Sequence, residues 1–293
     1  MIRTIVGAAL FVLCAACANS LASRPSGQAA VCAPYNGAAP VAESASSHVV
    51  ILGEALHGTS ESPEALFGLA CLLSARRVPV LVGIEAERTF SSELDAFLTH
   101  RDAEKLRAAT PQMWAVHDGR SSQATLLLLQ NLGQLRAAGA DVSIFAFDAV
   151  WPADAREDED WGTVTRDAKM AETVDAAVRD FPGAVILLTG GFHARKQAFS
   201  FAGTRFVPMA TGITARPVLS YEMRHAGGTG WIMGEVDGQP VEGAVSLMNL
   251  LPEGVPVRTF VPGHPAGSED WDGAYYTGPI TASPPAFPAG LPP

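Results

Sequence analysis

The sequence predicts a three-layer α/β fold, with a mainly parallel central sheet covered by helices on both faces. From residue 48 onward, short apolar runs alternate with segments of helical periodicity. These runs are apolar throughout, which is typical of strands buried on both faces. Strands that alternate with helices are joined by right-handed crossovers and therefore run parallel. Weaker strand patterns beyond Ala198 predict some antiparallel strands toward the C-terminus.

The elements follow one another in a regular order. Apolar runs predict strands at Val49–Leu52, Val80–Ile84, Val142–Phe147 and Val185–Leu188. Helical spacing of apolar residues predicts helices over Pro63–Ala75, Ser91–Leu98, Ala103–Ala109, Gln123–Ala138 and Val164–Phe181. Later strands are expected at Arg205–Val207, Val218–Glu222, Trp231–Met233, Val257–Val261 and Ala274–Tyr276. The highly charged stretch Ala153–Trp161 is expected to be a solvated loop.

The first 22 residues have the composition of an export signal. Arg3 is their only charged residue, Ile5–Ala18 is almost wholly apolar, and Ser20-Leu21-Ala22 has small residues at the spacing of a cleavage site. We therefore expect an exported protein, periplasmic or associated with the outer membrane. A lipoprotein signal with Cys17 as the lipidated residue is the second interpretation. Beyond it, we expect a linker over residues 23–47, one domain over 48–280 and a Pro-rich tail over 281–293.

Cysteines and charge limit the partners that the chain can have. After cleavage, Cys32 and Cys71 remain in an oxidising compartment, where either a disulfide between them or a buried Cys71 with an unpaired Cys32 is expected. The formal net charge is −10 and no run of Lys and Arg occurs, which argues against nucleic acid and anionic membrane surfaces. Membrane contact is expected only through a lipid anchor at Cys17, and the oligomeric state stays open.

Acidic and histidine residues follow each of the first four predicted strands. Glu54 and His57 follow the first strand, Glu85 the second, Asp148 the third and His193 the fourth. Because the carboxyl ends of parallel strands lie at one edge of the sheet, these side chains are expected to converge on one cleft.

These residue types suit hydrolysis by an activated water molecule. We expect His57 or His193 to deprotonate water, Glu54 or Glu85 to orient that base, and the second histidine to act as acid or oxyanion donor. The sequence contains no Gly-x-Ser-x-Gly elbow, which favours direct attack by water over a serine nucleophile. The same four residues would also suit a zinc or manganese site, and their spacing does not decide between the two.

Five short motifs, in this order, resemble those of the erythromycin esterase family. They are GEALHGTSE at 53–61, IEAE at 84–87, FAFD at 145–148, RDAKMAE at 166–172 and GGFH at 190–193. The last two, with the continuation HARK, are also similar to the ChaN haem-binding lipoproteins of the wider Tiki superfamily. The resemblance spans about Val49–Ala198 and implies the α/β fold predicted above. It places Glu54, His57, Glu85 and His193 at the family's functional positions.

The resemblance implies an exported hydrolase that cleaves an ester, lactone or peptide bond and requires no cofactor. In the erythromycin esterases a histidine is thought to activate water without a metal, whereas Tiki-type relatives use a divalent ion, here Mn or Zn. The alternative is a ChaN-like haem- or metal-binding uptake protein without turnover. The expected partner is a small-molecule or peptide substrate. The chain lacks room for the helical insertion that forms the macrolide cleft, so a macrolide is not expected.

Further residues are expected to support the site or bind substrate, namely Arg88, Trp114, His117, Arg120, Asp148 and Arg166. By resemblance to a tryptophan-containing lip, Trp114 is expected to wall the pocket, while Arg120 binds a substrate carboxylate or phosphate. A packing tryptophan and a surface arginine are the alternative. Arg166 is expected to pair with Asp148 or Glu85, and its neighbour Asp167 to be a helix cap or N-terminal charge.

Overall fold

The computed structural model describes residues 32–150, 161–236, 239–249, 251, 254–263 and 268–287. The expected signal peptide, Cys17 and all but the last residue of the charged stretch 153–161 lie outside these residues. Within them, no helix combines the length and the apolar character that crossing a bilayer requires.

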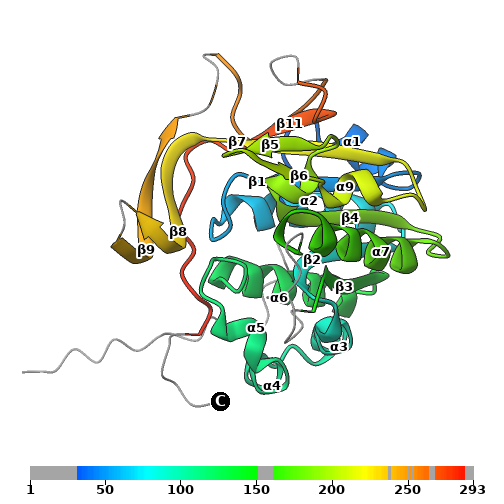
Figure 1. The fold of residues 1–293 in the computed structure, drawn as a ribbon. Helices are drawn as coiled ribbons and strands as arrows, with labels where there is room; N and C mark the ends of the chain where they lie inside the picture. Colours follow the sequence, from blue (N-terminus) through cyan, green and yellow to red (C-terminus); the bar gives the residue numbers. More distant parts are fainter. Residues whose placement is uncertain are drawn as a thin grey trace, which may run out of the picture.

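A central sheet of seven strands organises the protein (Figure 1). Its strands are β1 (Val49–Glu54), β2 (Val80–Glu87), β3 (Val142–Asp148), β4 (Ala184–Gly190), β7 (Val218–Arg224), β10 (Thr259–Pro262) and β11 (Gly273–Tyr276). They are arranged in the order β10-β11-β7-β1-β4-β2-β3. Neighbouring strands from β11 to β3 pair in parallel, whereas β10 at the edge is antiparallel to β11. The predicted sheet, parallel with an antiparallel strand toward the C-terminus, is therefore confirmed.

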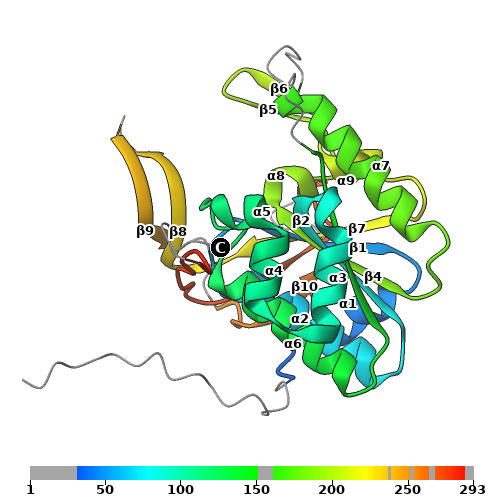
Figure 2. The same cartoon turned by 90° about the horizontal axis from the view of Figure 1, so that it is seen from below.

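Helices cover both faces of this sheet (Figures 1 and 2). The α-helices are α1 (Ala38–Ser44), α2 (Glu61–Ala75), α3 (Ser91–His100), α4 (Ala103–Ala109), α5 (Pro111–Ala115), α6 (Gln123–Ala137), α7 (Arg166–Val178), α8 (Gly191–Ala194) and α9 (Met209–Gly212). A 3-10 turn, η1 (Arg88–Phe90), follows β2, and a π-helical turn, η3 (Trp161–Thr165), precedes α7. Buried residues of α1, α2, α3 and α6 pack on one face, and those of α7, α8 and α9 on the other.

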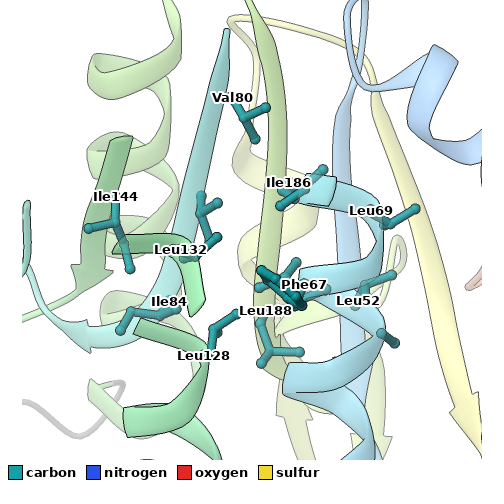
Figure 3. Close-up of a cluster of buried hydrophobic side chains, with 14 of the residues drawn as sticks. Leu52, Phe67, Leu69, Val80, Ile84, Leu128, Leu132, Ile144, Ile186 and Leu188 are labelled. Atoms are coloured by element: carbon teal, nitrogen blue, oxygen red, sulfur yellow. The ribbon is translucent and has the colours of Figure 1, made fainter. Parts of the chain in front are cut away.

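The alternation of side chains along the strands divides the core into two clusters. In β1, Val50 and Leu52 enter the cluster under α2 and α6, whereas Val49 and Ile51 enter the cluster under α7. Figure 3 shows the first cluster, in which Leu52 lies near Phe67 and other apolar side chains of the sheet and helices. Strands that are apolar on both faces thus occupy the middle layer, as the sequence predicted.

Two segments that were expected to flank the domain are part of it. Residues 38–44, expected as linker, form α1 with buried apolar side chains, and Cys32 is joined to Cys71 of α2 by a disulfide. Residues 281–287, expected as the start of the tail, run across the domain, where Ser283 N donates to Gly58 O at 2.8 Å. Composition predicted that both segments lie outside the domain. Long-range backbone hydrogen bonds and a disulfide produce no periodic pattern of apolar residues, so the sequence does not reveal them.

Two antiparallel hairpins stand outside the central sheet. One pairs β5 (Phe199–Phe201) with β6 (Thr204–Phe206), and the other pairs β8 (Ala226–Val236) with β9 (Gln239–Asn249). The expected strands at 205–207 and 231–233 therefore belong to hairpins. The β8–β9 hairpin projects from the body in both views (Figures 1 and 2), and Trp231 N attaches it to Gly58 O at 3.0 Å.

Candidate functional site

The carboxyl ends of four parallel strands bring the predicted residues together. Glu54 is the last residue of β1 and His57 lies in the following turn, Glu85 lies near the end of β2, Asp148 ends β3, and His193 lies in α8 directly after β4. Because β4 lies between β1 and β2, its end at Gly190 separates the residues of β1 from Glu85. A Cβ atom at Gly190 would lie 3.1 Å from His57 Nε2, so glycine permits the close approach of this ring.

Glu85 is the centre of the cluster. Its side chain accepts hydrogen bonds at Oε2 from Thr189 Oγ1 at 2.7 Å and Gly190 N at 2.8 Å. At Oε1 it accepts from Arg166 Nη2 at 2.9 Å and Arg120 Nη1 at 3.4 Å. Burial opposes ionisation, but the charges of the nearby histidines and arginines outweigh it and hold the pKa of Glu85 well below its usual range. Glu85 is therefore an anion that its hydrogen bonds hold in place, and its charge raises the pKa of the neighbouring histidines.

Two carboxylate–imidazole pairs flank Glu85. His57 Nδ1 lies 2.8 Å from Glu54 Oε2, and His193 Nδ1 lies 2.8 Å from Asp167 Oδ1. The other ring nitrogens face the centre, with Nε2 of His57 3.6 Å from Glu85 Oε2 and Nε2 of His193 3.7 Å from Glu85 Oε1. Each outer carboxylate fixes the orientation of its ring, so both Nε2 atoms face the Glu85 carboxylate, that of His57 at Oε2 and that of His193 at Oε1.

The surrounding carboxylates raise the pKa of both imidazoles. Burial alone would lower the pKa of His57, but Glu85 and Glu54 outweigh burial and raise it to about 9. The pKa of His193 is raised against burial by Glu85 and Asp167. Burial raises the pKa of Glu54, although its hydrogen bond with His57 counteracts part of this effect. In the unliganded site, His57 is therefore an imidazolium at neutral pH.

Two arginines connect Glu85 to Asp148. Arg166 donates to both carboxylate oxygens of Asp148, from Nε at 2.8 Å and from Nη2 at 2.6 Å, while its Nη1 lies 3.3 Å from His193 Nε2. Arg120 Nη1 donates to Asp148 Oδ2 at 3.0 Å, and its Nε and Nη2 are held by Asp118 Oδ2 at 2.8 and 2.6 Å. Because its guanidinium group is bound by carboxylates, Arg120 does not present a free fork to a substrate anion.

Three supporting residues lie away from this cluster. Trp114 packs in the core, where its Nε1 donates to Thr110 Oγ1 at 3.0 Å and its ring meets Phe287 edge-on. It therefore acts as a packing residue and does not wall the pocket as the resemblance implied. Arg88 is exposed in η1. His117 lies in the loop after α5, with its Nδ1 2.7 Å from Glu242 Oε1.

Three residues of the cluster were not predicted as site residues, namely Asp118, Asp167 and Thr189. Asp167, expected to act at the start of a helix, accepts hydrogen bonds from His193 and from Met209 N at 2.6 Å. Asp118 holds Arg120, and Thr189 donates to Glu85. The sequence offers one signal for each: Asp167 and Asp118 are acids within two positions of a predicted arginine, and Thr189 ends a predicted strand.

Cavities border the cluster on several sides. One of about 370 Å³ is lined by Glu85, Arg120, Asp148 and Arg166 together with apolar residues such as Phe90 and Met113. A second, of about 20 Å³, touches Glu54, His57, Glu85 and Thr59. Thr59 Oγ1 is buried there and has no hydrogen-bond partner within the described part of the chain. A third, of about 170 Å³, lies on the His193 side.

The polar groups around Glu85 also bear on metal binding. In the described ranges, no group of three or more His, Cys, Asp and Glu side chains is arranged to hold a metal ion. Both oxygens of Glu85 are engaged by N–H or O–H donors, and both oxygens of Asp148 by Arg166. The carboxylates that would bind a cation are thus already neutralised by guanidinium groups.

No protein-family model and no curated protein sequence matches the chain. Among solved structures, a mutant of the erythromycin esterase EreC in its open conformation is similar over 71% of this chain and 78% of that chain, with 16% identity and a TM-score of 0.50. A protein from Bacillus cereus is similar over 84% and 92%, with 12% identity and a TM-score of 0.51. A succinoglycan biosynthesis protein is similar over 70% and 73%, with 10% identity and a TM-score of 0.50. These likenesses show a shared fold.

Proposed function

From a fold shared with the erythromycin esterase EreC, we propose that this chain is an exported hydrolase that cleaves an ester, lactone or peptide bond with an activated water molecule and no metal ion. The observation that carries the proposal is the convergence of two imidazoles on Glu85. Each has its own carboxylate partner at 2.8 Å and directs its Nε2 atom to one oxygen of the Glu85 carboxylate. One base and one acid that face each other across a fixed anion suit acyl transfer to water.

His57 is the general base in this mechanism. The cavity of about 20 Å³ beside it has room for one water molecule, with Thr59 Oγ1 and the Glu54–His57 pair as polar partners. The water oxygen attacks the carbonyl carbon while its proton passes to His57 Nε2. Glu54, hydrogen-bonded to Nδ1, stabilises the imidazolium that forms.

His193 and Arg166 act on the other side of the reacting carbonyl. Asp148 and Glu85 hold Arg166 through its Nε and Nη2 atoms, and its Nη1 atom, which lies against His193 Nε2, stabilises the oxyanion that develops when water attacks. His193, whose pKa is raised, then donates its proton to the leaving oxygen or nitrogen as the bond to the carbonyl carbon breaks. Asp167 keeps the ring oriented during this transfer.

Two observations support a mechanism without a metal ion and the export of the protein. The permanent charges of Arg120 and Arg166 lie against Glu85 and Asp148, and they repel a divalent cation from these carboxylates. The Cys32–Cys71 disulfide fits an oxidising compartment, which agrees with the export signal expected in residues 1–22.

The proposal is tested with a panel of esters, lactones and peptides, assayed with and without a chelator. We expect hydrolysis of at least one ester or lactone at a rate that the chelator leaves unchanged. Loss of activity that Mn or Zn restores would replace the metal-free mechanism with a metal-dependent one. Absence of turnover over the whole panel, together with a Soret shift on adding haemin, would instead favour the haem-binding alternative.

The pH dependence of kcat/KM is expected to report His57. For a 4-nitrophenyl ester, whose leaving group needs no proton from His193, only the base must be in the right state, so kcat/KM should rise about tenfold per pH unit from neutral pH and level off near the pKa of about 9. Glu54→Gln removes a negative charge and a charged hydrogen-bond acceptor from the ring, so the midpoint should move to lower pH. A profile that is flat over this range, or one with the same midpoint in both proteins, would contradict the assignment.

A further inference from the structure

Four phenylalanine rings form a cluster beside His193. Phe192 of α8 lies 5.1, 5.5 and 5.8 Å, between ring centroids, from Phe199, Phe201 and Phe206 of the β5–β6 hairpin. Phe199 and Phe206 are stacked at 5.3 Å. Figure 2 shows this hairpin beyond one end of α7, and β6 contacts the turn η3 that precedes α7. The cluster therefore stands next to the segment that carries Arg166.

Two of these rings are much more exposed than packed aromatic side chains usually are. Phe192 is 44% exposed and Phe201 is 57% exposed, although each contacts other rings. Large apolar side chains that gather at the surface in this way mark binding sites for apolar groups. Their position beside a proposed general acid suggests a ligand that reaches His193.

A cavity of about 170 Å³ connects the rings with the polar cluster. Phe192, Phe206 and Pro208 are among its apolar walls, and Arg166, Asp167 and His193 line its polar end. Arg166 also lines the cavity of about 370 Å³, so the two cavities are neighbours that share this residue as a wall. A substrate whose carbonyl contacts Arg166 would place one of its two parts in each cavity.

We propose that the 170 Å³ cavity binds the leaving group of the substrate and that it selects an apolar alcohol with a six-membered ring, such as a benzyl group. The inference rests on the proposed hydrolase function, because it takes His193 as the acid that protonates the leaving oxygen. An apolar cavity of about 150 Å³ is large enough for benzene, so the size fits one ring with a short linker. Arg166 and His193, both hydrogen-bond donors at the polar end, suit the ester oxygen.

The test compares benzyl acetate with ethyl acetate, because the two share an acyl group and differ in the alcohol. We expect the ratio of their kcat/KM values to favour benzyl acetate at least about tenfold in the wild-type protein. Phe206→Ala, and to a smaller extent Phe206→Leu, should lower this ratio. Met248→Ala is the control, because Met248 is an exposed apolar residue of the β8–β9 hairpin and does not line the cavity, and it should keep the ratio. A wild-type ratio near one, or equal ratios in all variants, would overturn the proposal.

Direct binding separates failure of this inference from failure of the proposed function. Benzyl alcohol binding, measured by ligand-observed NMR, does not require turnover. We expect binding to the wild-type protein and to Met248→Ala, and weaker binding to both Phe206 variants, whose folding is checked by thermal melting. If the protein binds benzyl alcohol in this pattern but hydrolyses no ester, the result would support the proposed pocket and refute the proposed hydrolase function. Binding that is equal in all the variants, or undetectable in the wild type, would exclude the pocket.

Discussion

Replacement of His57 by alanine is expected to lower kcat/KM for ester hydrolysis about a thousandfold while the protein stays folded. A positioned general base contributes about a hundredfold to ten-thousandfold to such a reaction, and the His57 ring is the group that faces the small cavity beside Glu54. The side chain is 22% exposed and lies outside the two apolar clusters, so its loss should leave the core intact. The rate is measured with purified variants whose far-UV circular dichroism matches that of the wild type.

The choice of ester separates the role of His57 from that of His193. A 4-nitrophenyl ester has a leaving group that departs without protonation, whereas an ethyl ester requires an acid. His57→Ala should therefore reduce the rates of both esters by a similar factor. His193→Ala should reduce the rate of the ethyl ester much more than the rate of the 4-nitrophenyl ester. His100→Ala, which changes a histidine at the end of α3, is the control and should keep the wild-type rates. Equal activity in His57→Ala and wild type would refute the assignment of the base.

Glu85→Ala is expected to reduce the free energy of unfolding by about 3 to 5 kcal/mol and to abolish hydrolysis. Removing one partner from a buried ionic network leaves the other charges uncompensated. Here the guanidinium of Arg166 would lose one of its two carboxylate partners, and Thr189 Oγ1 and Gly190 N would lose their acceptor. Urea denaturation monitored at neutral pH measures the loss of stability.

Glu87→Ala provides a matched control for this experiment. Glu87 lies two residues further along the same strand and lines the cavity of about 370 Å³, but its side chain is partly exposed. Its removal should change stability by no more than about 0.5 kcal/mol. Glu85→Gln keeps a hydrogen-bond acceptor without the charge, so its stability should lie between those of the wild type and Glu85→Ala. A Glu85→Ala protein as stable as the wild type would contradict the network described here.

The sequence predicted the part of the site that follows from strand order. Apolar runs located the four strands, and the parallel arrangement placed Glu54, His57, Glu85 and His193 at one edge of the sheet without any further information. It did not predict the partner of His193. Asp167 lies in the first turn of α7, where an acid is usually explained by the helix dipole, and its contact with His193 depends on how α7 packs against the end of β4.

Other features depended on contacts between distant parts of the chain. Trp114 was expected either to wall the pocket or to pack in the core, and its ring is buried against Phe287, a contact that a local pattern cannot reveal. Residues 38–44 and 281–287 have few large apolar side chains in a regular period, so composition suggested segments outside the domain. Residues 38–44 are held by the burial of Ala38, Val41 and Ala42 in the core, and residues 281–287 by backbone hydrogen bonds to distant loops.

Residues 281–287 connect two of the loops that carry residues of the site. Ser283 N donates to Gly58 O, directly after His57, and Ser283 Oγ accepts from Ala124 N at the start of α6. Ala286 N donates to Ser121 O, next to Arg120. The turn that carries His57 and the loop that carries Arg120 are thus held together by a segment that is distant from both in the sequence. A local opening of residues 281–287 would therefore release His57 and Arg120 together while the strands of the central sheet stay paired.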